Sequence, residues 1–309
     1  MTTVASCVPV AAPSRPPRWY SHPFNHVAAY RAAAVIASAL PRRARLKLAA
    51  ALGGVAAGAL PRERSRVEAN LARVRPDLAT RARAALARDV FRHFAVCFAD
   101  LVVANRQRRL PERLLAAIRG GENLAEAGAG GRGIVVLTAH LGNWEFAGRL
   151  LAHRLPRPTH VVVAPEADAG VERFLRAVPG AVKFVTRRDP RSVLPLMGAL
   201  RRGEIVAMQG DRGLGNRGDV AMSFFGAPAP FPLGPFVLAR AAAVPVVPSF
   251  CVFEPDRRYT IAVGEPITVT EGAEIEALAT WVKALEAAVR AHPEQWFNFF
   301  DAWSVPSAA

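Results

Sequence analysis

The sequence predicts an α/β fold, in which a central, mostly parallel mixed sheet is flanked by helices and preceded by an N-terminal helical segment. Two observations predict it. After residue 128, short β-branched runs alternate with helical patterns, at the spacing of a layered structure with a largely parallel sheet. Before that point the periodicity is mainly helical. With 309 residues, about half of them apolar, the chain can bury a substantial core.

The N-terminal segment is basic and amphipathic. Residues 1–18 include three prolines within 13–17 and predict a disordered start. From about 24 to 60 two helical segments are separated at Pro41, and basic residues punctuate their apolar side chains: Arg31, Arg42, Arg43, Arg45 and Lys47. Such a pair can lie in the headgroup region of a bilayer; the alternative is a plain surface hairpin packed on the domain. We therefore divide the chain into 1–18, a membrane-associating segment 19–60, and a main domain 61–305.

No run of about 20 strongly apolar residues exists, so the sequence does not predict a transmembrane helix. The first dozen residues lack a basic region ahead of an apolar core, so a secretory signal is not predicted either. Cys7, Cys97 and Cys251 lie far apart without a CxxC spacing, which disfavours disulfides and zinc and fits a reducing compartment. We expect no metal site.

The charge balance favours an anionic partner. Forty basic residues against 25 acidic ones give a formal charge of +15, most of it from arginine. Nucleic acid, an anionic membrane surface or an acidic carrier protein would each fit, and a GC-rich genome would also inflate arginine. Aromatic residues do not interleave with the basic ones and no recognition motif appears, so we expect no nucleic-acid partner.

Residues 61–118 are interpreted as continuing helix. Within them, Leu86, Val90, Phe94 and Phe98 recur at spacings of four and form an apolar stripe suited to burial. A further short helix is expected to start at Pro111 and to end at Gly120-Gly121.

The alternating region begins after a glycine-rich run, 128–133. Because this run precedes a strand, it is neither a P-loop nor a dinucleotide fingerprint, which follow one. The expected strands are 134–138, 161–163, 182–186, 205–208, 244–253 and 259–263, the last two paired. The expected helices are 144–155, 170–177, 192–202 and 273–291.

The segment His140-Leu-Gly-Asn-Trp-Glu145 lies where the first of these strands gives way to a helix. Ligands of open α/β sheets bind at such carboxyl ends of strands. On one continuous helix, positions five apart point about 140° from each other, but a turn through Gly142 would let Glu145 approach His140. Glu145 would then orient His140 as a general base, with Asn143 as the N-cap. Alone, the pair could equally be a strand cap and a helix-dipole partner.

A covalent acyl-enzyme is disfavoured, because no serine stands in a GxSxG setting and no cysteine is near His140 in the sequence. The sequence around His140 resembles the HX4D/E motif of lysophospholipid-acyltransferase-like proteins. More narrowly, it resembles the late acyltransferases of lipid A biosynthesis and their phosphatidylinositol-mannoside acyltransferase relatives. The resemblance covers roughly residues 65–303, in the blocks 131–145, 208–212, 224–248 and 292–296.

The resemblance implies transfer of a fatty acyl group from acyl carrier protein or coenzyme A to a hydroxyl of a glycolipid, with no other cofactor. A lipid A precursor, a phosphatidylinositol mannoside and a lysophospholipid are the candidate acceptors. His140 would deprotonate the hydroxyl and Glu145 would balance its charge. Backbone N–H groups near Asn143, or an arginine, would stabilise the oxyanion. The expected location is the cytoplasmic face of the bacterial inner membrane, peripheral or weakly anchored.

Further substrate-binding residues are expected where other strands end. Arg187 and Arg188 follow the strand 182–186 and would bind a phosphate or carboxylate; a solvated basic turn is the alternative. Asp211 and Arg212 follow the strand 205–208 and would position the head group of the acceptor; a structural salt bridge is the alternative.

Two features depart from the family. The N-terminal anchor is diluted with Ala, Gly and Arg, and the terminal block continues as an aromatic segment, 297–303, where basic residues are usual. The rival functions are a lipid hydrolase that uses His140 and Glu145 on water, a basic nucleic-acid-binding protein, and a catalytically inactive membrane-binding relative.

Overall fold

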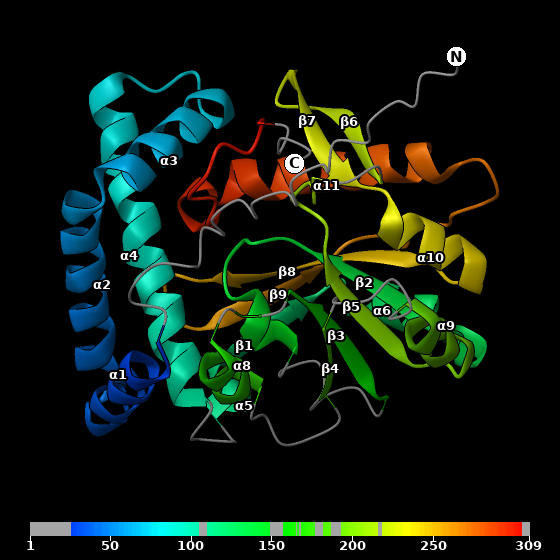
Figure 1. Cartoon of the computed structure of the whole chain (residues 1–309), viewed down its shortest axis with the longest axis horizontal. Helices are drawn as coiled ribbons and strands as arrows, with labels where there is room; N and C mark the ends of the chain where they lie inside the picture. The colour runs from blue at the N-terminus through cyan, green and yellow to red at the C-terminus, as the bar shows by residue number, and fades with distance from the viewer. Residues whose placement is uncertain are drawn as a thin grey trace, which may run out of the picture.

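The computed structural model describes residues 26–104, 110–148, 157–164, 166, 168–176, 182–186, 193–215 and 218–304. Figure 1 shows a helical layer, α1 to α4, standing beside a twisted sheet that has helices on both faces. The expected disordered start, 1–18, lies outside the described residues.

The helical layer is built on one long helix, α4 (Thr80–Ala104), against which α1 (Val27–Ala39), α2 (Arg42–Ala59) and α3 (Pro61–Val74) pack. The break expected at Pro41 is confirmed, since α1 ends at Ala39 and α2 begins at Arg42. Close packing of α2 on α4 depends on Gly53, where a Cβ would lie 2.5 Å from the carbonyl oxygen of Phe91. Val90 in the stripe of α4 is fully buried, and the other members pack against core clusters as expected.

The expected α/β class is confirmed. Seven strands form the main sheet in the order β1-β9-β8-β2-β5-β3-β4. Five of them are mutually parallel: β2 (Ile134–Thr138), β3 (Thr159–Val163), β4 (Val182–Thr186), β5 (Ile205–Gln209) and β8 (Val246–Phe253). The antiparallel partner of β8 is β9 (Tyr259–Val263), so the pairing expected for the last two strands is confirmed.

The structure corrects the helical interpretation of residues 61–118. After α5 (Leu110–Leu114) the chain forms an edge strand, β1 (Leu115–Arg119), parallel to β9. Its sequence, Leu-Ala-Ala-Ile-Arg, has no strand periodicity, and pairing with β9 overrides the helical preference of alanine. A short helix, α6 (Gly121–Ala127), then begins at Gly121, where the sequence analysis placed a helix end.

A two-stranded hairpin, β6 (Asp219–Phe224) and β7 (Ala227–Pro232), was not expected from the sequence, because β7 contains three prolines. They occupy alternate positions, opposite Ser223, Ala221 and Asp219 of β6. Alternation puts the three nitrogens that lack a hydrogen on the same edge of the strand, so β7 tolerates them.

Two cores lie on the two faces of the sheet, and strand β2 shows how the sequence makes both. Val135 and Leu137 face the cluster formed with α9 (Val193–Arg201), α10 (Gly234–Ala242) and α11 (Glu274–Ala291). Ile134 and Val136 face the cluster formed with α3, α4 and α6. A strand buried on both sides is a continuous apolar run, as residues 134–137 are.

The sequence predicted the ends of three helices to within a few residues. The expected helices 170–177, 192–202 and 273–291 correspond to α8 (Ala169–Arg176), α9 and α11. Of the expected helix 144–155, the described residues 144–148 are helical.

Candidate active site

The site lies at the carboxyl edge of the two central strands. In the parallel pair β2 and β5, Thr138 is in register with Gln209. His140 lies two residues beyond the end of β2, and Asp211 lies two residues beyond the end of β5. The shared register therefore brings together two side chains that are 71 residues apart in the sequence.

His140 and Asp211 form a close pair. Nδ1 of His140 lies 2.7 Å from Oδ1 of Asp211, and the backbone N–H of His140 donates to Oδ2 at 3.1 Å. The Asp211 side chain is fully buried, whereas 14% of the His140 side chain remains exposed. The imidazole thus reaches the surface while the carboxylate that contacts it does not.

The pKa values favour a neutral imidazole beside an ionised carboxylate. Burial lowers the pKa of His140 below 6.5 and the charge of Arg212 lowers it further, against the opposing effect of Asp211. Burial by itself raises the pKa of Asp211, but the charge and hydrogen bonds of His140 and the charge of Arg212 hold it at about 2. With a proton on Nδ1 shared with Asp211, Nε2 is the ring nitrogen that carries the lone pair.

The partner observed at Nδ1 of His140 is a residue other than the expected Glu145. The carboxylate hydrogen-bonded to Nδ1 belongs to Asp211, which the sequence analysis had assigned to the acceptor's head group. A fully buried carboxylate offers no surface for an acceptor. Glu145 lies in the first turn of the helix that begins at Trp144, and its side chain is exposed. Burial raises the pKa of Tyr30 in α1, and the charges of Glu166 and then Glu145 raise it further, which is consistent with Glu145 facing that helix.

The turn between His140 and the helix requires glycine at position 142. Gly142 has a φ of +61°, and a Cβ there would lie 1.9 Å from the carbonyl oxygen of Cys251. The turn expected at Gly142 is confirmed. The left-handed conformation disfavours a side chain, and the close approach to β8 excludes one.

Asn143 is confirmed as the N-cap, because its Oδ1 accepts from the N–H of Phe146 at 3.3 Å. Its Nδ2 donates to the carbonyl of Cys97 and to the hydroxyl of Tyr259. With 3% of its surface exposed, Asn143 holds the loop, and direct substrate binding by its side chain is not what the geometry indicates.

The C-terminal segment closes the loop from the other side. The N–H of Gly142 donates to the carbonyl of Gln295, and the N–H of Phe297 donates to the carbonyl of His140. The N–H of Asn143 is held by the carbonyl of Cys251. Because these loop N–H groups are engaged, neither Gly142 nor Asn143 supplies the backbone oxyanion donor that the sequence analysis expected there.

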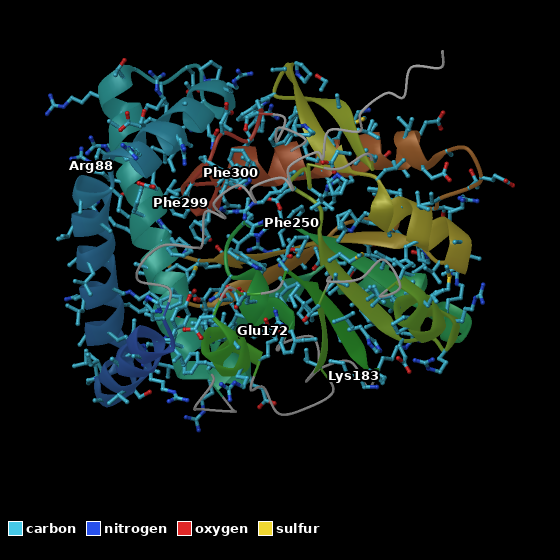
Figure 2. All side chains as sticks on the ribbon, in the orientation of Figure 1. Arg88, Glu172, Lys183, Phe250, Phe299 and Phe300 are labelled. Carbon is cyan, nitrogen blue, oxygen red and sulfur yellow. The ribbon has the colours of Figure 1, made fainter. Side chains whose placement is uncertain are left out.

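Arg212 is held at the rim of the site. Nε donates to Oδ1 of Asn298 at 2.9 Å and Nη2 donates to the carbonyl of Phe297 at 2.9 Å. The guanidinium lies 4.8 Å from the ring centre of Phe300, and Figure 2 shows Phe299 and Phe300 between the helical layer and the sheet. The aromatic terminal segment thus fixes an arginine whose charge reaches His140.

Arg187 and Arg188 lie outside the described residues, so their predicted phosphate-binding role stays a prediction. Cys97 and Cys251 are buried thiols, as expected. Among the residues that the structure describes, no group of three or more His, Cys, Asp or Glu side chains is arranged to hold a metal ion.

Fold and site together define an α/β protein with a histidine–aspartate pair at the carboxyl edge of its central strands. The chain belongs to the bacterial lipid A biosynthesis acyltransferase family, whose model matches residues 19–304.

Two curated relatives and one solved structure are similar. A phosphatidylinositol mannoside acyltransferase of Mycobacterium tuberculosis, from two strains, is 28% identical over 207 residues, which is 63% of this chain. The alignment spans 62% of the length of those relatives. The crystal structure of a 1-acyl-sn-glycerophosphate acyltransferase from Thermotoga maritima has 15% identity and a TM-score of 0.40, covering 84% of this chain and 100% of that one.

Proposed function

We propose that the protein is a membrane-surface acyltransferase, which moves a fatty acyl chain from a thioester of acyl carrier protein or coenzyme A to a hydroxyl of a glycolipid. The observation that carries the proposal is the partly exposed imidazole of His140, held through Nδ1 by a buried, ionised Asp211. A lipid A precursor is the acceptor that the family suggests. A phosphatidylinositol mannoside is the second candidate, since that substrate class is in the name of the similar mycobacterial protein.

In the proposed reaction, Nε2 of His140 takes the proton from the acceptor hydroxyl as its oxygen attacks the thioester carbonyl. The tetrahedral intermediate collapses, the C–S bond breaks, and the thiolate receives the proton from His140. Donor and acceptor react directly, so no acyl-enzyme forms. Asp211 keeps the proton on Nδ1 and stabilises the imidazolium that appears between the two proton transfers.

Arg212 is the proposed donor to the developing oxyanion or to a phosphate of a substrate. Its guanidinium donates to Asn298 and to the carbonyl of Phe297 and carries its positive charge beside His140. Those contacts and Phe300 restrict its orientation, which favours electrostatic stabilisation without reorganisation. The predicted role of Glu145, to hold and charge-balance His140, stays a prediction beside the observed contact with Asp211.

The proposed attachment to the membrane rests on α1 and α2. Five large apolar side chains on them are exposed: Val35, Ile36, Leu48, Leu52 and Val55. On α2 the last three follow spacings of four and three and form one stripe, beside which Arg43 and Lys47 are exposed. Residues 27–59 contain no acidic side chain. A basic helix with an apolar stripe is suited to lie on an anionic bilayer.

Whether a helix can cross the bilayer depends on its length and its hydropathy. Within the described ranges, no helix combines the length and the hydropathy that a membrane span requires. We propose that the protein lies on the cytoplasmic face of the bacterial inner membrane. The segment 19–60, which contains α1 and α2, would contact the bilayer.

The decisive experiment is mass spectrometry of membrane lipids from cells with and without the gene. Loss of one acyl chain from one lipid class, restored by the wild-type gene, identifies the acceptor. Unchanged lipids would contradict the proposal.

The matching variants are His140→Ala, which removes the base, and His140→Asn, whose side-chain N–H can still donate to Asp211. Both should fail to restore the lipid, with transfer reduced by about 10²-fold or more. His93→Ala on α4 is the control and should restore it. Near-normal transfer by folded His140→Asn would contradict the mechanism. Release of free fatty acid at the rate of transfer would favour the hydrolase.

A further inference from the structure

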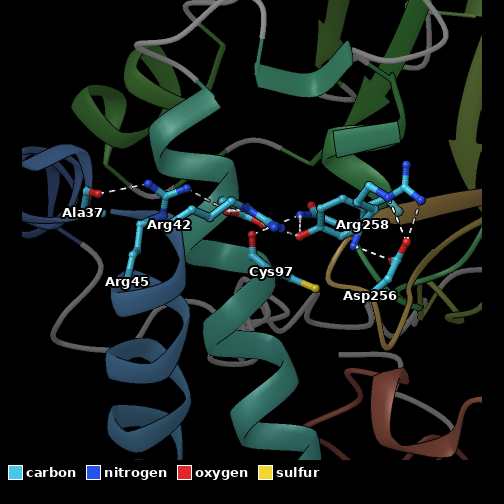
Figure 3. Close-up of polar contacts among 9 residues, drawn as sticks. Ala37, Arg42, Arg45, Cys97, Asp256 and Arg258 are labelled. Carbon is cyan, nitrogen blue, oxygen red and sulfur yellow. Dashed lines mark hydrogen bonds and ion pairs between the residues drawn. The ribbon is translucent and has the colours of Figure 1, made fainter. Parts of the chain in front are cut away.

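A buried chain of polar contacts joins α2 to the helix that follows His140. Its centre is Asp100 of α4, whose side chain is fully buried. Arg42 donates to it through Nε at 3.2 Å and Nη2 at 2.7 Å, and Arg45 donates through Nη2 at 3.0 Å. In Figure 3 the contacts run from α2, through α4, to the β8–β9 hairpin.

Tyr259 carries the chain from the helical layer to the sheet. Its hydroxyl donates to Oδ2 of Asp100 at 3.1 Å and accepts from Nδ2 of Asn143 at 3.1 Å. Burial raises the pKa of Tyr259 well above 10, and nearby groups including Asp100 raise it further, so the hydroxyl keeps the proton that it donates. Its ring contacts Phe146 and Phe253, which fixes the hydroxyl's direction.

The Asn143 side chain connects these contacts to the loop that carries His140. It has two side-chain N–H groups, one on Tyr259 and one on the carbonyl of Cys97, so its Oδ1 is directed at the N–H of Phe146. The helix therefore begins at a fixed residue, and His140 stands three residues before Asn143. Without the Tyr259 hydroxyl, one buried N–H of Asn143 loses its acceptor and the cap can rotate.

Stability alone is a poor reason for this arrangement. Burying a carboxylate between two guanidinium groups costs desolvation free energy that the attraction only offsets, and well-packed apolar side chains would often do as well. A connected polar chain does favour one geometry, since a shift breaks hydrogen bonds between buried groups.

We propose that Asp100 and Tyr259 are positioning residues for the reaction at His140. Through their hydrogen bonds they link the position of α2, the helix with the exposed apolar stripe, to the position of Asn143, the N-cap of the helix beside the base. The inference rests on the proposed function of the site, and the chemistry itself stays with His140.

The test compares two full-length variants that each lose one buried hydroxyl. Tyr259→Phe keeps the ring and removes the link. Thr260→Val is the matched control, because the next residue of the strand points to the opposite face and is also buried. The probes are palmitoyl-coenzyme A, a palmitoyl thioester of acyl carrier protein, and vesicles of total membrane lipid from the producing cells.

We expect Tyr259→Phe to lower kcat by about 10-fold, with KM for the thioester within about twofold of the wild type, because the geometry of the base is disturbed and substrate contacts are not. Thr260→Val should retain the kcat of the wild type. Asp100→Asn, which keeps the shape but loses the charge, should resemble Tyr259→Phe.

Hydrogen exchange of the peptide 140–148 supplies a second readout. In Tyr259→Phe this peptide should exchange at least about 10-fold faster than in Thr260→Val, at equal global stability, because the cap has loosened. Equal exchange and equal kcat in the two variants would overturn the inference. An inactive wild type would contradict the proposed function instead, while the exchange comparison would still decide whether the chain of contacts positions the loop.

Discussion

At the scale of single residues, the sequence singled out His140, but it did not predict the contact of its Nδ1 with Asp211. His140 was visible because it follows a buried strand within a six-residue motif. Asp211 is 71 residues away and becomes a neighbour only because β5 pairs with β2. The order of strands in a sheet is not encoded locally, so Glu145, close in sequence, was the natural inference. A signal did exist, since Asp211 also follows a strand at the same offset.

Two isosteric variants separate the carboxylates. Asp211→Asn should lower kcat by about 10²-fold or more, since the amide no longer stabilises the imidazolium and no longer fixes the tautomer. Glu145→Gln should lower it less. Acyl transfer assays on the two purified proteins make the comparison. A larger loss in Glu145→Gln would return the orienting role to that residue.

The pH dependence follows from the lowered pKa of His140. The base works when neutral, so kcat/KM should rise with pH through that pKa, with a midpoint below 6.5, and level off above it. Arg212→Gln removes a charge that lowers this pKa, so its midpoint should move to higher pH. A pH series with both proteins measures the two midpoints. An unmoved midpoint in Arg212→Gln would show that the arginine does not act on His140.

At the scale of elements, the loop from His140 to the next helix depends on one backbone conformation. Gly142→Ala should destabilise the fold by on the order of 3 kcal/mol and abolish transfer, because the Cβ meets the carbonyl oxygen of Cys251. Gly130→Ala is the control, since Gly130 has a similar φ of +68° and open space around its Cβ. It should cost only about 1 kcal/mol. Urea unfolding of both variants would reveal equal costs if the close approach to β8 were unimportant.

The α2 stripe makes a separate prediction. Replacing Leu52 and Val55, 59% and 68% exposed, by Asp should reduce co-sedimentation with anionic vesicles by at least about 10-fold, through lost apolar burial and added negative charge. Ile275→Asp on α11, at 54% exposure, is the matched control and should bind as the wild type does. Equal loss in both would show that α2 has no special role at the membrane.

The elements that sequence reasoning missed have different causes. β1 lacks the alternation that marks a strand and depends on β9, far along the chain, whereas the three prolines of β7 conceal the local pairing of the β6–β7 hairpin. The parallel strands were visible because burial on two faces demands a continuous apolar run, here rich in β-branched residues and short. Local pattern therefore predicted the core of the sheet, and tertiary pairing decided its edge.

At the scale of the whole molecule, acid should weaken the fold in a way that can be assigned to one carboxylate. Hydrogen bonding to Arg202, and to a lesser extent to His160, lowers the pKa of Glu204 from 4.5 to about 2 against the effect of burial. A lowered folded-state pKa contributes stability above the unfolded value, and this stability is lost as pH falls toward 2. Solvent around Arg202, whose side chain is 59% exposed, screens this contribution at neutral pH.

Glu204→Gln should therefore be less stable than the wild type at pH 7 and equally stable near pH 2. Urea unfolding at several pH values measures this difference in the free energy of unfolding. The contribution of Asp211 is the same in both proteins, so it cancels in the difference. A difference that stays constant with pH would mean that Glu204 acts through packing alone.

The closing of the His140 loop by residues 295–297 has a consequence for biosynthesis. The chain is made from its N-terminus, so α2, the proposed membrane contact, and the central strands emerge while Gln295 and Phe297 are still untranslated. Until they arrive, the carbonyl of His140 and the N–H of Gly142 lack their partners. In a half-made chain the proposed membrane-contacting helix is thus complete before the His140 loop is, and the loop gains its last hydrogen bonds only near the end of synthesis.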